Sequence, residues 1–181
     1  NWPQLDRVRA SLDGARQEGL EVHCDAYPYE AWSTSLATNF PGWAKEGGQF
    51  VARLKDPAER ARMRGETEHA VAANGGWSTL MLASGLAQAD QALLGRRLDE
   101  VARERGQEPF EVACELLTRG SVSILGFGIA TADMDRILTQ PFCLIASDGS
   151  GLTASGRTGH PRSFGAFPRA YRRYVRELSA M

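Results

Sequence analysis

Two residues of the sequence, His23 and Asp148, have the side chains and the settings of metal ligands. His23 lies in the segment 22–29, and Asp148 ends the apolar run 142–147 and precedes the glycine-rich turn 149–151. Imidazole and carboxylate groups bind zinc, and functional groups of a βα barrel come from the carboxyl ends of its strands. If both segments are strands of one barrel, a histidine and a carboxylate point into the same mouth. The pair would then begin a hydrolytic metal centre.

Other roles stay open for both residues when they are taken alone. A lone histidine is more often a core or edge residue than a ligand, and an aspartate before glycine can cap the following turn. The segment 147–151 could also bind a phosphate, but it lacks the spacings GxxxxGK[ST] and GxGxxG. Neither residue type alone therefore decides the chemistry.

A third candidate region is the aromatic loop 159–169, which follows the Asp148 segment and contains two prolines and two glycines. A rigid loop at this place can carry substrate-binding groups, and the guanidinium of Arg162 is shaped to bind a carboxylate. His160 lies in the same loop, and Tyr27 shares one face of the segment 22–29 with His23. We predict substrate-binding roles for Arg162, Tyr27 and His160. The alternative is a loop that leads into a helix and whose arginines face water.

The composition limits the classes of function. The chain has 181 residues, a net charge of −1 and 43% hydrophobic residues, which allow a real core and argue against nucleic acid or an anionic membrane as main partner. No apolar run approaches the ~20 residues of a membrane span, and no signal peptide pattern is seen. The three cysteines are far apart without a CxxC motif, so they are expected to be reduced core residues. We therefore expect a cytoplasmic protein.

The order of predicted elements is typical of an α/β fold with parallel strands. Helices are predicted over 4–18, 57–73, 96–105, 109–118, 132–139 and from about 168, and strands over 20–27, 77–84, 121–129 and 142–147. The stretch 30–55 reads as irregular. This is about half of an eight-stranded barrel, which needs ~250 residues. Either the chain is a smaller open sheet, or it is the late part of a larger barrel.

For two of these helices the sequence supports detailed predictions. Asp56 is the predicted N-cap of the second helix, Pro57 its first residue, and Glu59 completes a capping box. The last helix is expected to face water with its arginines and to bury one apolar stripe, which consists of Phe167, Ala170, Tyr171, Tyr174, Val175 and Leu178.

Several ordered segments resemble one family. The segment 22–29, which ends in D-x-Y-P-Y, resembles the strand-6 region of the N-acyl-D-amino-acid deacylases (D-aminoacylases) of the amidohydrolase superfamily. The similarity runs from about residue 3 to 178. Further matching segments are 31–36, 41–43, 46–48, 54–57, 146–149, 159–169 and 174–177.

The resemblance implies a partial (β/α)₈ barrel of late strands that spans 1–181, with an inserted helical segment at about 37–76. It implies hydrolysis of N-acyl-D-amino acids, small-molecule substrates, to a carboxylate and a free D-amino acid. His23 matches the strand-6 metal histidine. Asp148 matches the strand-8 aspartate, which binds metal and acts as general base and then general acid. Arg162 would bind the substrate carboxylate.

The resemblance also implies one or two zinc ions, whose remaining ligands are expected before residue 1. A zinc site needs at least three protein ligands, so the 181-residue chain is expected to be an inactive fragment of the enzyme. Two alternatives remain. One is an amidohydrolase of cyclic amides, of the hydantoinase or dihydroorotase type, and the other is a non-catalytic α/β module that binds an anion.

Overall fold

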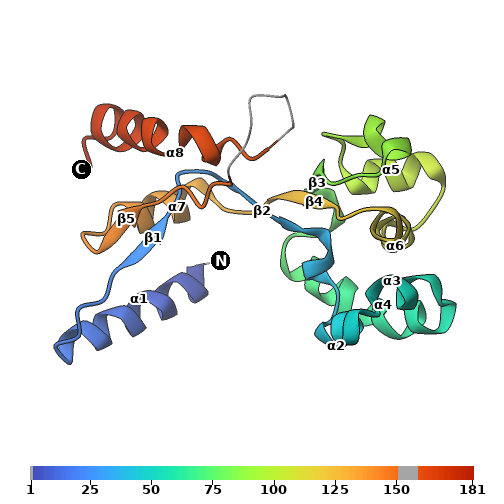
Figure 1. Cartoon of the computed structure of the whole chain (residues 1–181). Coiled ribbons are helices and arrows are strands. Elements are labelled where there is room, and N and C mark those ends of the chain that lie inside the picture. The colour runs from blue at the N-terminus through green and yellow to red at the C-terminus, as the bar shows by residue number, and fades with distance from the viewer. Residues whose placement is uncertain (1, 151–158) are drawn as a thin grey trace. The chain divides into compact units, whose positions relative to one another are not determined.

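The computed structural model describes residues 2–150 and 159–181, and the chain divides into two compact units (Figure 1). We call them unit 1 and unit 2 and describe each by itself. Unit 1 consists of 1–30, 129–152 and 161–181, and unit 2 of 31–128 and 153–160. The segment predicted as an insertion, 37–76, lies within unit 2.

Unit 1 is built on a short parallel pair of strands with helices. Its elements are α1 (Trp2–Gln17), β1 (Cys24–Ala26), α7 (Thr131–Leu138), β5 (Cys143–Ile145), α8 (Arg162–Ala170) and the π-helical η5 (Tyr171–Glu177). Strands β1 and β5 run parallel, with Cys24 opposite Cys143 and Ala26 opposite Ile145. The parallel arrangement predicted for the first and last strands is thus confirmed, although each strand is shorter than predicted.

The core of unit 1 is small and includes one ionic group. Met134, Leu138, Ala170 and Tyr174 are its buried residues. The Asp135 carboxylate accepts hydrogen bonds from Arg173 Nε (2.7 Å) and from the Tyr174 hydroxyl (2.8 Å). The Arg173 guanidinium beside it, helped by Tyr174, holds the pKa of Asp135 below its usual value, against the opposing effect of partial burial.

The last helix buries a different face from the predicted one. Ala166, Ala170 and Tyr174, spaced four residues apart, are buried, so the prediction is confirmed for Ala170 and Tyr174. It is wrong for Phe167, Tyr171, Val175 and Leu178, which are exposed together with Phe164. These five residues form an exposed stripe along α8 and η5. The helical periodicity of apolar residues could not show which of the two apolar faces of this helix is buried.

Unit 2 contains an antiparallel sheet. Strands β2 (Ala31–Ser35), β3 (Leu80–Ser84) and β4 (Ser123–Phe127) lie in the order β2–β4–β3, and both neighbours of β4 are antiparallel to it. The prediction of parallel strands is therefore wrong for β3 and β4, and β2 lies in the stretch predicted as irregular. Ala31 pairs with Phe127 and Ser35 with Ser123.

The helices of unit 2 follow the predicted signals more closely. They are η1 (Leu36–Asn39), α2 (Gly42–Lys45), η2 (Glu46–Gly48), α3 (Phe50–Lys55), α4 (Pro57–Ala73), η3 (Trp77–Thr79), η4 (Gln88–Leu93), α5 (Leu98–Arg105) and α6 (Pro109–Arg119). Helix α4 has the predicted bounds. The Asp56 side chain accepts hydrogen bonds from the backbone N–H groups of Ala58 (2.8 Å) and Glu59 (3.3 Å), which confirms the predicted N-cap.

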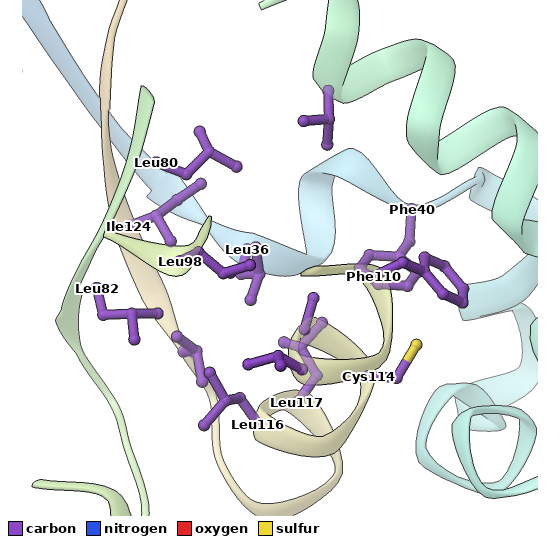
Figure 2. Close-up of a cluster of buried hydrophobic side chains, with 14 of the residues drawn as sticks. Leu36, Phe40, Leu80, Leu82, Leu98, Phe110, Cys114, Leu116, Leu117 and Ile124 are labelled. Carbon is purple, nitrogen blue, oxygen red and sulfur yellow. The ribbon is translucent and has the colours of Figure 1, made fainter. Parts of the chain in front are cut away.

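A broad apolar core holds unit 2 together. Figure 2 shows leucines of β3 and Ile124 of β4 facing Leu36 and side chains of α5 and α6. Farther along the cluster, the rings of Phe40 and Phe110 lie 5.8 Å apart, centroid to centroid. At Gly126 the Trp32 ring lies on the backbone so closely that an added Cβ would come within 2.1 Å of it. Only glycine fits between these two strands.

The structure thus has a mixed α/β architecture. The described part of the chain contains one two-stranded parallel sheet and one three-stranded antiparallel sheet, which by themselves do not confirm a partial barrel. None of the described helices has the length and the apolar character that crossing a membrane requires.

Candidate functional site

The carboxyl ends of β1 and β5 carry the polar residues of unit 1 that are best placed for chemistry. The ladder continues past β5, because Ala146 N donates to Ala26 O (2.9 Å). Tyr27 therefore follows β1 directly, and Asp148 follows β5 after two more residues. In open and closed α/β sheets, this is the edge at which ligands bind.

Arg162 connects these two strand ends. Its Nη2 lies 2.9 Å from Asp148 Oδ2, and its guanidinium carbon lies 4.7 Å from the centre of the Tyr27 ring. Only 9% of the Arg162 side chain is exposed, against 68% of the Asp148 side chain. The arginine is therefore a fixed support, not a water-facing residue, and the Asp148 carboxylate is accessible while one of its oxygens is held.

The turn that carries Asp148 is fixed by other residues. Asp148 has a φ of 43°, in the left-handed region. Ser147 Oγ accepts from Gly149 N (3.2 Å), and Ser163 Oγ accepts from Ser150 N (3.2 Å). The turn-capping side chain in these bonds is thus Ser147, and the alternative role of Asp148 as cap is not seen in them. At Gly149 an added Cβ would lie 2.9 Å from Ser163 Cα, so the turn packs tightly on α8.

A second arginine, Arg169, holds the end of β1. Its Nε donates to Pro28 O (2.5 Å), its guanidinium lies 4.9 Å from the centre of the Tyr29 ring, and its Nη2 lies 3.8 Å from Glu30 Oε2. No functional role was predicted for Arg169 or Tyr29, and Arg169 was expected to face water. The available signal was the pair of arginines 162 and 169, which lie two helical turns apart and therefore share one face of α8.

His23 lies at the opposite end of the strand pair. Because β1 and β5 run parallel and Cys24 pairs with Cys143, His23 directly precedes β1, whereas Asp148 follows the end of β5. The two residues therefore flank opposite ends of this strand pair. A metal-binding role of His23 stays a prediction.

The surroundings of His23 agree with that placement. Its side chain is 45% exposed, and its Nε2 lies 3.3 Å from Glu21 Oε1. The sequence predicts His23 within a strand over 20–27, whereas in the structure it lies just before the shorter strand β1. The extent of this strand could not be predicted locally, because it depends on pairing with the distant strand β5.

His160 is buried in unit 2. Its Nε2 lies 2.7 Å from the backbone oxygen of Ala31, so in the tautomer with a proton on Nε2 it donates a hydrogen bond there. This contact fixes the ring on the main chain. A substrate-binding role of His160 stays a prediction.

The described residues do not form a metal centre by themselves. Within the ranges 2–150 and 159–181, no group of three or more His, Cys, Asp or Glu side chains could hold a metal ion. A structural or catalytic zinc site needs at least three protein ligands. The described residues therefore do not fit a complete zinc site, although Asp148 could supply one ligand.

Two curated relatives are similar in sequence, whereas no protein-family model matches the chain. D-aminoacylase of Alcaligenes xylosoxydans xylosoxydans is 42% identical over 86 residues, which cover 48% of this chain and 16% of the relative. N-acyl-D-glutamate deacylase of the same organism is 26% identical over 181 residues, which cover all of this chain and 29% of the relative.

Solved structures of the same enzymes are similar in fold. N-acyl-D-glutamate deacylase from Bordetella bronchiseptica, in complex with zinc and a phosphonate that mimics the tetrahedral intermediate, has a TM-score of 0.65 and 23% identity over all of this chain and 30% of its own. A D-aminoacylase with a binuclear metal centre has a TM-score of 0.63 and 25% identity over 98% of this chain and 29% of its own.

Together, these matches confirm the resemblance predicted from the sequence: this chain is similar to D-aminoacylases and N-acyl-D-glutamate deacylases in sequence and in fold. It spans less than a third of the length of each relative.

Proposed function

We propose that this chain, a relative of the N-acyl-D-amino-acid deacylases, is the portion of such an enzyme that carries its proton-transferring carboxylate. The reaction is hydrolysis of the amide of an N-acyl-D-amino acid to a carboxylate and a free D-amino acid. The observation that carries the proposal is the accessible Asp148 carboxylate at the carboxyl end of β5, held by the buried Arg162. The partial barrel of late strands is part of the same proposal.

Asp148 has the chemistry that amide hydrolysis requires. A carboxylate can accept the proton of the attacking water and return it to the leaving nitrogen, which is a poor leaving group without that proton. The ion pair with Arg162 fixes the direction of the carboxylate, and the exposed oxygen of Asp148 stays within reach of a substrate. The rigid turn makes this orientation reproducible.

Arg162 and Tyr27 are the proposed contacts for the substrate. A guanidinium has five N–H donors in a planar fork, so Arg162 can bind the α-carboxylate of the substrate while it stays close to Asp148. The Tyr27 ring packs against the guanidinium and limits its rotation. This arrangement would hold the D-amino acid end of the substrate next to the proton-transferring group.

A zinc centre in the complete enzyme would need ligands beyond the described residues. Asp148 is the ligand that we propose from this chain. We propose no step through the metal here, because residues 2–150 and 159–181 contain no group of three or more side chains that could hold the ion. By itself the 181-residue chain is proposed not to turn over substrate.

The test is Asp148→Asn in a full-length protein that contains this sequence. We expect turnover of an N-acyl-D-amino acid, measured as free D-amino acid by chiral chromatography, to fall about 10²–10⁴-fold, as for loss of a general acid–base. Circular dichroism should be unchanged. Asp13→Asn on the exposed surface of α1 is the matched control and should keep full activity. An active Asp148→Asn enzyme, or equal hydrolysis of the L-enantiomer, would contradict the proposal.

A further inference from the structure

Two of the three cysteines of the chain lie side by side in unit 1. Cys24 and Cys143 are direct partners in the register of β1 and β5, so their side chains leave the same face of the strand pair. Neighbouring strands lie about 4.7–4.9 Å apart, which is within the Cα–Cα range of about 4.4–6.8 Å that a disulfide spans. We propose that Cys24 and Cys143 are a reversible thiol–disulfide pair that joins β1 to β5. The proposal does not depend on the catalytic function.

The surroundings of the two thiols bring them into contact. Burial raises the pKa of the Cys143 thiol to about 12, and a hydrogen bond with the Cys24 side chain adds to the rise. Both residues are half-buried. Cys143 packs against the core of unit 1, as do Ala26 of β1 and Ile145 of β5.

A cavity makes one of the two sulfurs accessible. Cys24 lines an apolar cavity of about 220 Å³ in unit 1, together with residues of α1 and α7 that include Leu5, Val8, Leu12 and Ile137. Because Cys143 is not among its lining residues, a small disulfide compound that uses this route reaches Cys24 first. The half-buried Cys143, whose raised pKa makes it harder to deprotonate, is then the second nucleophile.

The reaction is thiol–disulfide exchange with a low-molecular-weight disulfide, R–S–S–R. The Cys24 thiolate attacks one sulfur of R–S–S–R, the S–S bond breaks, and the first R–S⁻ leaves and takes up the proton that Cys24 lost. Cys143 then loses its proton, and its thiolate attacks the Cys24 sulfur of the mixed disulfide. The second R–S⁻ leaves and takes that proton. The two cysteines are oxidised, and R–S–S–R is reduced to two thiols.

The cross-link would close a long loop. The chain leaves unit 1 after Glu30 and returns at Ile129, so the bond between Cys24 and Cys143 would enclose all of β2, β3 and β4. A disulfide that closes a long loop restricts the unfolded chain strongly, so the oxidised protein should unfold at a higher denaturant concentration.

The test is oxidation of the folded chain by glutathione disulfide. The chain, with its fold checked by circular dichroism, is incubated with excess glutathione disulfide and then alkylated. We expect the intact mass, measured before alkylation, to fall by two hydrogen atoms, and the non-reduced digest of the alkylated chain to contain one linked peptide pair, Cys24 with Cys143. Cys114→Ser, which removes the buried thiol of unit 2, should leave this product unchanged. Cys24→Ser and Cys143→Ser should each abolish it.

Two further measurements define the outcome. The midpoint of urea unfolding should rise on oxidation and return when dithiothreitol is added. Oxidation in urea should give mixed pairings that include Cys114, because the native register is then lost. Separate glutathione adducts on Cys24 and Cys143 without a linked peptide, or the same mixture of pairings from folded and unfolded chain, would overturn the proposal.

Discussion

Unit 1 and unit 2 are stabilised in different ways. Unit 2 has a single large cluster of buried apolar residues, contributed by the antiparallel sheet and by α3, α4, α5 and α6 (Figure 2). Unit 1 has four buried residues in its cluster. Its contacts are mainly ionic and polar, such as Asp135 with Arg173 and Tyr174, and Asp148 with Arg162. The candidate site therefore lies in the unit with the smaller core.

The same contrast is seen at the surface. Most of the large exposed apolar side chains belong to unit 1, and they include Leu144 on β5 and the exposed stripe of α8 and η5. Exposed apolar surface gives no stabilisation by burial, so unit 1 has less favourable free energy to offset the entropy of ordering its chain. We therefore expect unit 1 to open more easily than unit 2, on the timescale of amide hydrogen exchange.

The largest expected effect comes from one substitution made in each unit. Leu36→Ala in unit 2 should lower the free energy of unfolding by about 4 kcal/mol, and Leu138→Ala in unit 1 by about 2 kcal/mol. Both leucines are fully buried. The cavity in unit 2 is surrounded by many buried residues and cannot collapse, whereas the smaller cluster can rearrange. Urea unfolding with hydrogen exchange of β4 and β5 amides measures both. Equal losses would contradict the contrast between the two cores.

A smaller effect is expected from pH, and only in unit 1. The pKa of Asp135 is held low by Arg173, so its contribution to stability is present above the unfolded pKa of about 4 and is lost as the pH falls through the lower folded value. The protection of α7 amides against exchange, relative to their intrinsic exchange rates at each pH, should therefore fall below about pH 4. Asp135→Asn should remove this part of the pH dependence, and Asp13→Asn on the surface of α1 is the control. An unchanged pH profile in Asp135→Asn would show that the ion pair contributes nothing.

The smallest effect is a stabilisation in unit 1. Gly14 lies within α1, and an added Cβ would meet nothing within 4 Å. Gly14→Ala should therefore raise the stability of α1 by about 0.5–1 kcal/mol, by restricting the unfolded chain. The matched substitution in unit 2 is Gly85→Ala, where φ is 73° and the Cβ would lie 1.9 Å from the Ser121 oxygen. Gly85→Ala should therefore destabilise the protein. The unfolding temperature of each variant, compared with that of the unchanged chain, shows whether the substitution stabilises or destabilises.

Local sequence signals predicted the local structure well. Asp56 and Pro57 define the start of α4, and the glycine after each of α5 and α6 marks its end, because caps depend on residues a few positions apart. The antiparallel sheet was not predictable in the same way. Alternating helices and strands are typical of parallel sheets, and β2 is hidden in an irregular-looking stretch, so only the tertiary pairing of β2, β3 and β4 reveals their direction.

The candidate site could be predicted only in part, because residue types are local signals whereas the contacts between distant residues depend on the fold. Asp148 could be recognised because a carboxylate follows a continuous apolar strand. Arg162 could be recognised because it lies close behind, in a segment predicted as a rigid loop that the structure shows to be the start of α8. That these two residues form an ion pair follows from the fold of the intervening turn, which residue types do not determine. The placement of His23 depended on the register of two strands far apart in sequence.

The left-handed backbone of Asp148 determines which substitutions can report on its chemistry. Among residues with a Cβ, asparagine and aspartate adopt a positive φ most readily, and glycine adopts it without steric cost. A saturation library at this position would thus be sorted first by folding, with bulky and β-branched side chains depleted whatever their reactivity. Alanine would mix loss of the acid with a local conformational penalty, whereas asparagine separates the two.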